Sequence, residues 1–118
     1  MRIRELMTAD PEACLATESC AAAVGIMRRR NCGFVPVVDS RAGRRVVGVV
    51  TDRDIALRFE QERRPASEIP VGECMTREVK TVAPDAGLPE AARLMERFAI
   101  HRLPVVQDGR LVGVLSLK

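Results

Sequence analysis

The sequence predicts an α+β fold in which a small unit of strands and helices occurs twice. The segment Ile3–Thr8 (Ile-Arg-Glu-Leu-Met-Thr) returns 68 positions later as Val71–Thr76. The same shift relates Val35–Val38 to Leu103–Val106. Each copy also has apolar residues at helical spacing, followed by short apolar runs typical of strands. Matches in one order and at one offset indicate two copies of one unit, and clefts between such copies are natural ligand sites.

Each copy is expected to begin with a short apolar strand, at residues 13–15 in the first and 79–82 in the second. A helix follows, starting near Thr17 or Asp85, whose side chains can accept hydrogen bonds from free N–H groups at a helix start. Apolar residues then recur at i, i+3, i+4 and i+7 in both helices: Cys20, Ala23, Val24 and Met27, and then Leu88, Ala91, Ala92 and Met95. This spacing predicts one core-facing stripe per helix, in which the methionines are packing residues.

Two strands are predicted after each helix, at residues 34–38 and 46–50 in the first copy and at 103–106 and 111–115 in the second. The dipeptide Asp108-Gly109 between the last two strands predicts a tight hairpin. The first copy has a longer turn over residues 40–45, so that Gly48 matches Gly113 at an offset of 65. The nearly continuous apolar character of these strands predicts burial on both faces.

A second helix is predicted in the first copy, from Asp52 to about Arg63, where the following Pro65 ends it. The order of elements is then β-α-β-β-α. We assign residues 1–64 to the first copy, 65–70 to a linker and 71–118 to the second copy. The second copy is expected to lack its closing helix, because the match to Asp54 would fall after Lys118.

The composition disfavours two classes of partner. The net charge is only +3, the charges are interspersed, and the chain has three Phe but no Trp or Tyr, so a nucleic-acid surface is not expected. The run Arg28–Arg30 closes a predicted helix, where cations complement the helix dipole. No stretch approaches the roughly 20 apolar residues that span a bilayer, and no signal peptide is recognisable, which favours a cytoplasmic protein.

The four cysteines lack the spacing of a metal site. Cys14, Cys20, Cys32 and Cys74 contain no Cys-x-x-Cys pair and are accompanied by a single His, so zinc is not expected. In a reducing compartment such residues are buried apolar side chains. A redox pairing among Cys14, Cys20 and Cys32 is the alternative.

The first candidate site is the segment Gly48–Asp54, in which a buried strand is expected to pass directly into a helix. Thr51 can cap that helix and Asp54 lies in its first turn, which is a sufficient structural role. A carboxylate and a hydroxyl at such a corner can also accept hydrogen bonds from a ribose diol. Both roles remain open from the residues alone.

The second candidate is His101-Arg102, which stands just before a predicted buried strand. The Arg guanidinium presents a planar fork of donors suited to phosphate, and His can add another donor. The alternative is a solvated strand edge. The matching residues of the first copy, Gly33-Phe34, carry no charge.

These motifs together resemble a known family. Met-Thr before the first strand, an apolar-Pro-Val-Val strand and Gly-Val-Val-Thr-x-x-Asp are similar to a tandem pair of cystathionine β-synthase (CBS) domains, or Bateman module. Thr-Asp-Arg-Asp-Ile-Ala most resembles small stand-alone CBS-pair proteins of bacteria. The resemblance covers essentially the whole chain. It implies two β-α-β-β-α repeats with pseudo-two-fold symmetry, and clefts that hold AMP, ADP, ATP or S-adenosylmethionine.

The resemblance also implies roles for individual residues. Thr51 and Asp54 would contact the ribose, and His101 and Arg102 the phosphates. The backbone near three further residues would line the adenine: Ala13, Cys32 and Gly33. One complete site is expected, because the other cleft would offer only Ser116 and the uncharged Gly33-Phe34.

The leading functional hypothesis is a regulatory module that binds an adenosyl ligand between its copies, works as a homodimer and acts on an effector protein. The alternative is a ligand-free structural or dimerisation module, or a redox-responsive stress protein. An enzyme is not expected, since the sequence shows no nucleophile partner for His101, no Gly-rich phosphate loop and no metal cluster.

Overall fold

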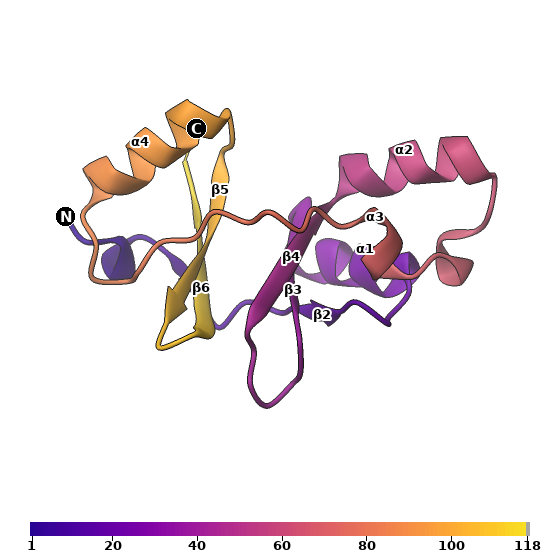
Figure 1. Cartoon of the computed structure of the whole chain (residues 1–118), viewed down its shortest axis with the longest axis horizontal. Helices are drawn as coiled ribbons and strands as arrows, with labels where there is room; N and C mark the ends of the chain where they lie inside the picture. The colour runs from indigo at the N-terminus through magenta and orange to yellow at the C-terminus, as the bar shows by residue number, and fades with distance from the viewer. Residues whose placement is uncertain (118) are drawn as a thin grey trace. The chain divides into compact units, whose positions relative to one another are not determined.

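Two three-stranded sheets organise the chain, and each belongs to its own compact unit (Figure 1). The computed structural model describes residues 1–117. We call Glu12–Val79 the interior unit, and Met1–Pro11 together with the chain from Lys80 the terminal unit. Lys118, the last residue of the predicted second copy, lies outside the described residues.

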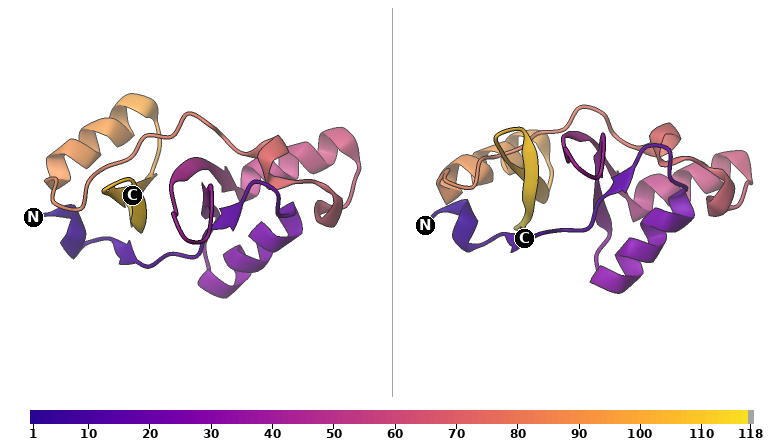
Figure 2. Two further views of the ribbon diagram at one scale, coloured as in Figure 1. Left: turned by 60° about the horizontal axis from the view of Figure 1, so that its bottom comes forward. Right: turned by 90° about the horizontal axis from the view of Figure 1, so that it is seen from below.

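The interior unit has the strand order β2-β3-β4. Strand β2 runs parallel to β3, and β3 runs antiparallel to β4. In chain order the elements are β2 (Cys14–Leu15), α1 (Cys20–Arg30), β3 (Phe34–Val38), β4 (Val46–Thr51), α2 (Asp52–Glu62), the 3₁₀ helix η2 (Ala66–Glu68) and α3 (Val71–Cys74). Helices α1 and α2 are in contact, and both lie on the same side of the β3–β4 hairpin in the two views of Figure 2.

The terminal unit has the strand order β1-β6-β5, with both pairs antiparallel. Its elements are the 3₁₀ helix η1 (Ile3–Glu5), β1 (Thr8–Ala9), α4 (Leu88–Phe98), β5 (Arg102–Gln107) and β6 (Arg110–Ser116). Asp108 and Gly109 both have positive φ, 52° and 76°, as the tight hairpin between β5 and β6 requires. The predicted Asp-Gly hairpin is thus confirmed.

Each compact unit combines parts of both sequence copies. In the interior unit, Val71 N–H donates to the carbonyl of Glu18 (2.8 Å) and Cys20 N–H donates to that of Ile69 (2.7 Å). The terminal unit has the two equivalent hydrogen bonds, 68 positions away in the sequence. The N–H of Ile3 donates to the carbonyl of Ala86 (3.0 Å), and the N–H of Leu88 donates to the carbonyl of Met1 (3.1 Å). The segment that opens one copy therefore folds onto the helix start of the other copy.

The Met-Thr motifs are exchanged in the same way. Thr76 forms a bridge with Val49 of β4, and Thr8 pairs with Val114 of β6. The preceding methionines lie over glycines of those strands, Met75 over Gly48 and Met7 over Gly113. Each compact unit is thus assembled from segments of both sequence copies.

The cores are apolar and separate. Fully buried residues of the interior core include Val35, Val37, Val50, Ile69 and Val71. The terminal core includes Ile3, Leu103, Val105 and Leu115, with α4 contributing Ala91 and Met95. Ile69 lies in the segment that the sequence suggested as a linker, and it is completely buried.

The predicted α+β class and the four hairpin strands are confirmed, but both predicted helix starts are wrong by two residues. Helix α1 is capped by Ser19, whose Oγ accepts the N–H of Ala22 (3.2 Å). Helix α4 starts after Gly87, which has no side chain to cap it. Asp85 instead accepts hydrogen bonds from the guanidinium of Arg4.

The strand predicted at 79–82 is reduced to one parallel bridge between Val82 and Val105. The prediction that every strand is buried on both faces is also wrong. Strands β4 and β6 alternate between buried and more exposed positions. The reason is that an antiparallel sheet can pack one face on the core and leave the other partly exposed. In the helical stripes, Ala92 is exposed, while Ile26 belongs to the buried face of α1.

Candidate functional site

The corner between β4 and α2 is built by a reciprocal pair of hydrogen bonds. The N–H of Asp54 donates to Thr51 Oγ1 (3.1 Å), and the N–H of Thr51 donates to Asp54 Oδ2 (2.9 Å). This capping box satisfies N–H groups that have no partner within the helix. Both side chains are half-buried. The structural role considered for Thr51 and Asp54 is therefore confirmed, and it occupies only one of the two carboxylate oxygens.

Gly33 lies beside this corner. The N–H of Asp52 donates to the carbonyl of Gly33 (3.1 Å), and the next residue, Phe34, pairs with Thr51 across the β3–β4 ladder. A Cβ at Gly33 would come within 2.7 Å of Asp52 Oδ2, so a larger residue would displace that carboxylate. The structure thus brings Gly33 together with Thr51 and Asp54.

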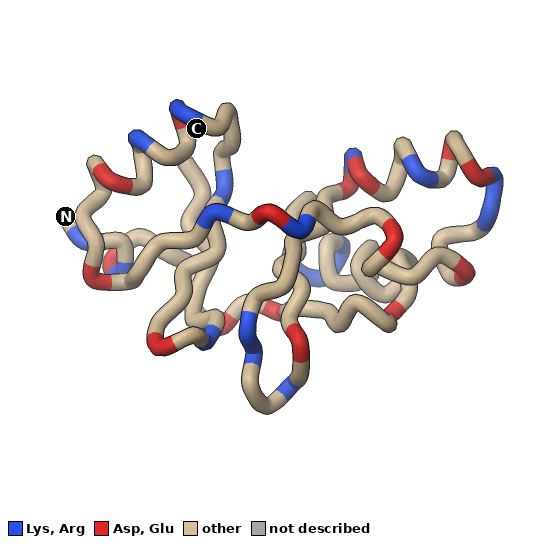
Figure 3. Tube along the Cα trace, in the orientation of Figure 1, with Lys and Arg blue, Asp and Glu red and all other residues tan. Residues whose placement is uncertain are grey.

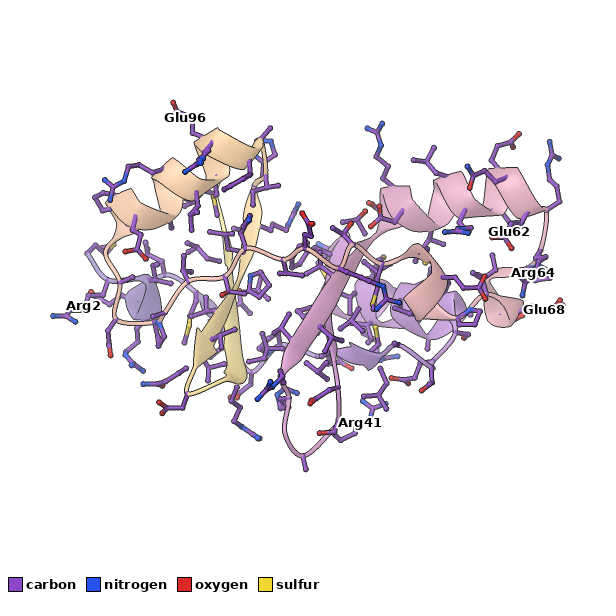
Figure 4. All side chains as sticks on the ribbon, in the orientation of Figure 1. Arg2, Arg41, Glu62, Arg64, Glu68 and Glu96 are labelled. Carbon is purple, nitrogen blue, oxygen red and sulfur yellow. The ribbon has the colours of Figure 1, made fainter. Side chains whose placement is uncertain are left out.

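Cys32 and Ala13 are anchored separately. The Sγ of Cys32 donates to the carbonyl of Phe34 (3.4 Å), which holds its side chain at the start of β3. Ala13 is buried just before β2, and its carbonyl accepts a hydrogen bond from Arg41 Nη1 (3.5 Å). Arg41 lies in the turn between β3 and β4 (Figure 4). It also forms an ion pair with Glu18 (2.8 Å). Sequence reasoning did not single out this arginine, because its turn carried no motif.

His101 and Arg102 belong to the terminal unit. Arg102 is the first residue of β5 and pairs with Ser116 of β6. The carbonyl of His101 accepts the N–H of Leu117 (3.0 Å), so the backbone is fixed while the imidazole is exposed. The pair Arg102–Ser116 corresponds to Phe34–Thr51 in the interior unit, which confirms the alignment of the two copies at this end of the ladder.

A different feature of the interior unit escaped the sequence analysis. An open groove of about 510 Å³ lies between α1 and α2. Its lining is mostly apolar and includes Val24, Ile55 and Phe59, with Asp52 and Cys32 also contributing. Phe59 is 50% exposed, and its neighbour Leu57 on α2 is 54% exposed.

The charges follow the pattern seen in the sequence. Acidic and basic residues are interspersed along α2 and α4 (Figure 3). Within residues 1–117, no three His, Cys, Asp or Glu side chains are grouped so that they could hold a metal ion. In the same part of the chain, every helix is too short or too polar to cross a bilayer.

Comparison with known proteins places these observations in a family. The CBS domain model matches residues 3–60 and again residues 71–118. The uncharacterized protein YlbB of Bacillus subtilis is 35% identical over 116 residues, which cover 98% of this chain and 77% of YlbB.

Two solved structures are similar over 98% of the chain. The first is a putative acetoin utilization protein (AcuB) from Vibrio cholerae, with a TM-score of 0.85, 34% identity and 84% of that chain covered. The second is the CBS domain pair of protein MJ0100, with a TM-score of 0.85, 28% identity and 92% covered. MJ0100 was crystallised with 5′-methylthioadenosine and S-adenosyl-L-methionine. With both copies matched by the family model and both units matched by its known structures, this chain belongs to the CBS domain family as a tandem pair.

Proposed function

We propose that this CBS pair is a regulatory module that binds an adenosyl ligand: AMP, ADP, ATP or S-adenosylmethionine. The observation that carries the proposal is the corner at Thr51 and Asp54. There, a half-buried carboxylate is oriented by the helix cap through Oδ2, and Oδ1 takes no part in the cap. The adenosyl ligands bound by the CBS pair of MJ0100 support this ligand class.

Each part of the ligand has matching chemistry in the chain. A ribose diol donates two hydrogen bonds, which Asp54 and Thr51 can accept. His101 and Arg102 supply donors and positive charge for phosphates, and Arg does so with a planar fork. Backbone groups near Ala13, Cys32 and Gly33 can accept and donate hydrogen bonds at the adenine edge.

Regulation then follows from differential affinity. A ligand shifts the conformational equilibrium of its receptor only to the extent that it binds one state more tightly. We propose that the module transmits this shift to an effector protein in the cytoplasm and that it performs no catalysis. We also propose a homodimer, which the exposed Leu57 and Phe59 on α2 support. Light scattering coupled to size exclusion tests the dimer.

The ribose assignment is tested by calorimetric titration of AMP, ADP, ATP and S-adenosylmethionine into the wild type and Asp54→Ala. We expect Asp54→Ala to weaken binding at least about tenfold, because charge-assisted hydrogen bonds to the ribose are lost. Glu60→Ala is the matched control, since Glu60 is an exposed acid on the same helix.

Asp54→Ala also removes half of the capping box, so its thermal melt is recorded and titrations are run where it is fully folded. Equal affinities in the wild type and in folded Asp54→Ala would contradict the ribose assignment. If none of the four ligands produced heat with the wild type, the adenosyl proposal would fail and a ligand-free structural module would be favoured.

The phosphate assignment predicts a difference between ligands. The double variant His101→Ala, Arg102→Ala should weaken ATP by about tenfold or more while leaving adenosine binding nearly unchanged, because adenosine carries no phosphate. Equal loss for both ligands would contradict it. Arg110→Ala, at the other end of the same hairpin, controls for the loss of net charge.

A further inference from the structure

Two cysteines of the interior unit lie in contact. The Sγ of Cys20 is 3.0 Å from the Sγ of Cys74, although 54 positions separate them in the sequence. Cys20 is the first residue of α1 and is completely buried, whereas Cys74 ends α3 and is half-buried. Both are free thiols.

The backbone holds this pair together without a covalent bond. Besides the hydrogen bond from Cys20 to Ile69, the N–H of Gly72 donates to the carbonyl of Ala16 (2.9 Å), and Ser19 forms a bridge with Pro70. The segments before α1 and around α3 are therefore fixed side by side. Because the sulfurs of a disulfide lie about 2.0 Å apart, bond formation needs only about 1 Å of further approach.

The remaining cysteines are engaged elsewhere. The Sγ of Cys14 faces the carbonyl of Pro36 (3.9 Å), and that of Cys32 faces the carbonyl of Phe34 (3.4 Å). The redox pairing considered from the sequence, among Cys14, Cys20 and Cys32, is therefore not the one that the structure favours. At the positions equivalent to Cys20 and Cys74, the terminal unit has Leu88 and Leu6.

We propose that Cys20 and Cys74 form a reversible dithiol–disulfide pair that is oxidised by hydroperoxides. The accessible Cys74 is the first to react. Its thiolate attacks the terminal peroxide oxygen, the O–O bond breaks, and Cys74 becomes a sulfenic acid while water or an alcohol leaves. The sulfur of Cys20 then attacks the sulfenic sulfur, the S–O bond breaks, and water leaves with the thiol proton. The two thiols together supply the two electrons that reduce one hydroperoxide, and an external dithiol restores them.

The second step is expected to be slow at neutral pH and faster in alkali. The pKa of Cys20 is raised to about 12, first by burial and then by the neighbouring Cys74, Cys14 and Glu73, which disfavour a negative charge there. Only a small fraction of Cys20 is thiolate at pH 7, and this fraction grows about tenfold per pH unit. Burial also raises the pKa of Cys14 to about 12, which keeps that thiol inert.

The test uses the full chain, reduced and then treated with equimolar hydrogen peroxide. Free thiols are alkylated and the protein is digested without reductant. Mass spectrometry should find the peptides of Cys20 and Cys74 joined, with the loss of two hydrogens. The unfolding transition of the interior unit should rise by about 10 °C and fall back with dithiothreitol, since a long loop has been closed.

Variants separate the two steps. Cys74→Ser should abolish both the link and the rise in melting temperature, whereas Cys20→Ser should leave a sulfenic acid at Cys74 that dimedone traps. Cys14→Ser and Cys32→Ser are the matched controls and should still form the link. A wild-type disulfide that joins other cysteines, only intermolecular disulfides, or sulfinic acid at Cys74 without a link would each overturn the proposal, whether or not the variants fold.

Discussion

Glu62 and Arg64 together connect three elements of the interior unit, α2, η2 and α3. The carboxylate of Glu62 accepts hydrogen bonds from Arg58 (2.9 Å), one turn back on α2, and from Arg64 (2.6 Å) just beyond the helix. Arg64 also donates to the carbonyl of Glu68 (2.5 Å) in η2 and lies 3.6 Å from the carboxylate of Glu73 in α3. Figure 4 shows Glu62, Arg64 and Glu68 gathered at this end of the unit.

This network predicts a pH-dependent contribution to stability. Hydrogen bonds from Arg58 and then Arg64 lower the pKa of Glu62 below its ordinary value of 4.5. A carboxyl whose pKa is lower in the folded state stabilises the fold above its unfolded pKa, and this stabilisation is lost as the pH falls through the folded value. Glu62→Gln should therefore reduce the urea midpoint at pH 7, and the difference from wild type should disappear near pH 3.

Glu60→Gln is the control for this experiment. Its carboxylate is 71% exposed and pairs with Arg63, whose side chain is 73% exposed. Such surface pairs contribute little, so this variant should match wild type at both values of pH. An undiminished effect of Glu62→Gln at pH 3 would show that packing and not charge is responsible.

At the scale of elements, each hairpin depends on a glycine where the exchanged Met-Thr segment crosses it. A Cβ at Gly48 in β4 would lie 2.7 Å from Met75 Sδ and 2.9 Å from the carbonyl of Thr76. At Gly113 in β6, the corresponding contacts are 2.5 Å to Met7 Sδ and 3.0 Å to the carbonyl of Thr8. The methionine can move, but the backbone carbonyl is held in a bridge, so the strand itself would have to shift.

Replacement of this glycine should therefore be costly. We expect Gly48→Ala to lower the free energy of unfolding by about 1–3 kcal/mol, the range typical of an overpacked core. Gly25→Ala is the matched control, because its Cβ would meet only the flexible end of Arg29 at 3.4 Å and alanine favours a helix. Urea denaturation of the two variants measures the difference. If both proved equally stable, the close approach of the Met-Thr segment would be refuted.

For the whole molecule, the repeat in sequence and the compact units in space do not coincide. The first sequence copy, residues 1–64, lacks Ile69 and Val71, which are completely buried in the interior core. It also carries Ile3, whose buried position belongs to the terminal core. Each such side chain contributes roughly 1.5–3 kcal/mol when buried, a large part of the stability of a small domain.

Fragments should therefore fold according to the compact units. We expect residues 12–79 to unfold cooperatively in urea and to give dispersed amide signals in NMR spectra. A fragment of residues 1–64 should do neither, although it contains one complete sequence copy. A folded 1–64 fragment together with an unfolded 12–79 fragment would refute this division of the chain.

Much of this protein could be predicted from local sequence. The capping box at Thr51 and Asp54, the Asp108-Gly109 hairpin and most residues of the two helical stripes follow from spacing, because they depend on residues a few positions apart. Alignment of the two copies predicted the order of elements. It also predicted that Arg102 is equivalent to Phe34 and Ser116 to Thr51, as the strand pairing confirms. The predicted helix starts were wrong because the first N–H groups of the helices find distant partners: the N–H of Cys20 donates to the carbonyl of Ile69, and that of Leu88 donates to the carbonyl of Met1.

Only the tertiary structure shows which strand each Met-Thr segment contacts and which cysteines lie together. It also gives the reason for the glycines at 48 and 113, where a Cβ would collide with those segments. The sequence by itself determined that there are two copies, and that Thr51 and Asp54 form a corner able to accept hydrogen bonds. It did not indicate that Cys20 contacts Cys74, because that contact arises when a segment of the second copy completes the core of the first. Periodicity records which face of an element is buried. The partner that this buried face contacts is decided only by long-range packing, in which two buried surfaces must fit each other.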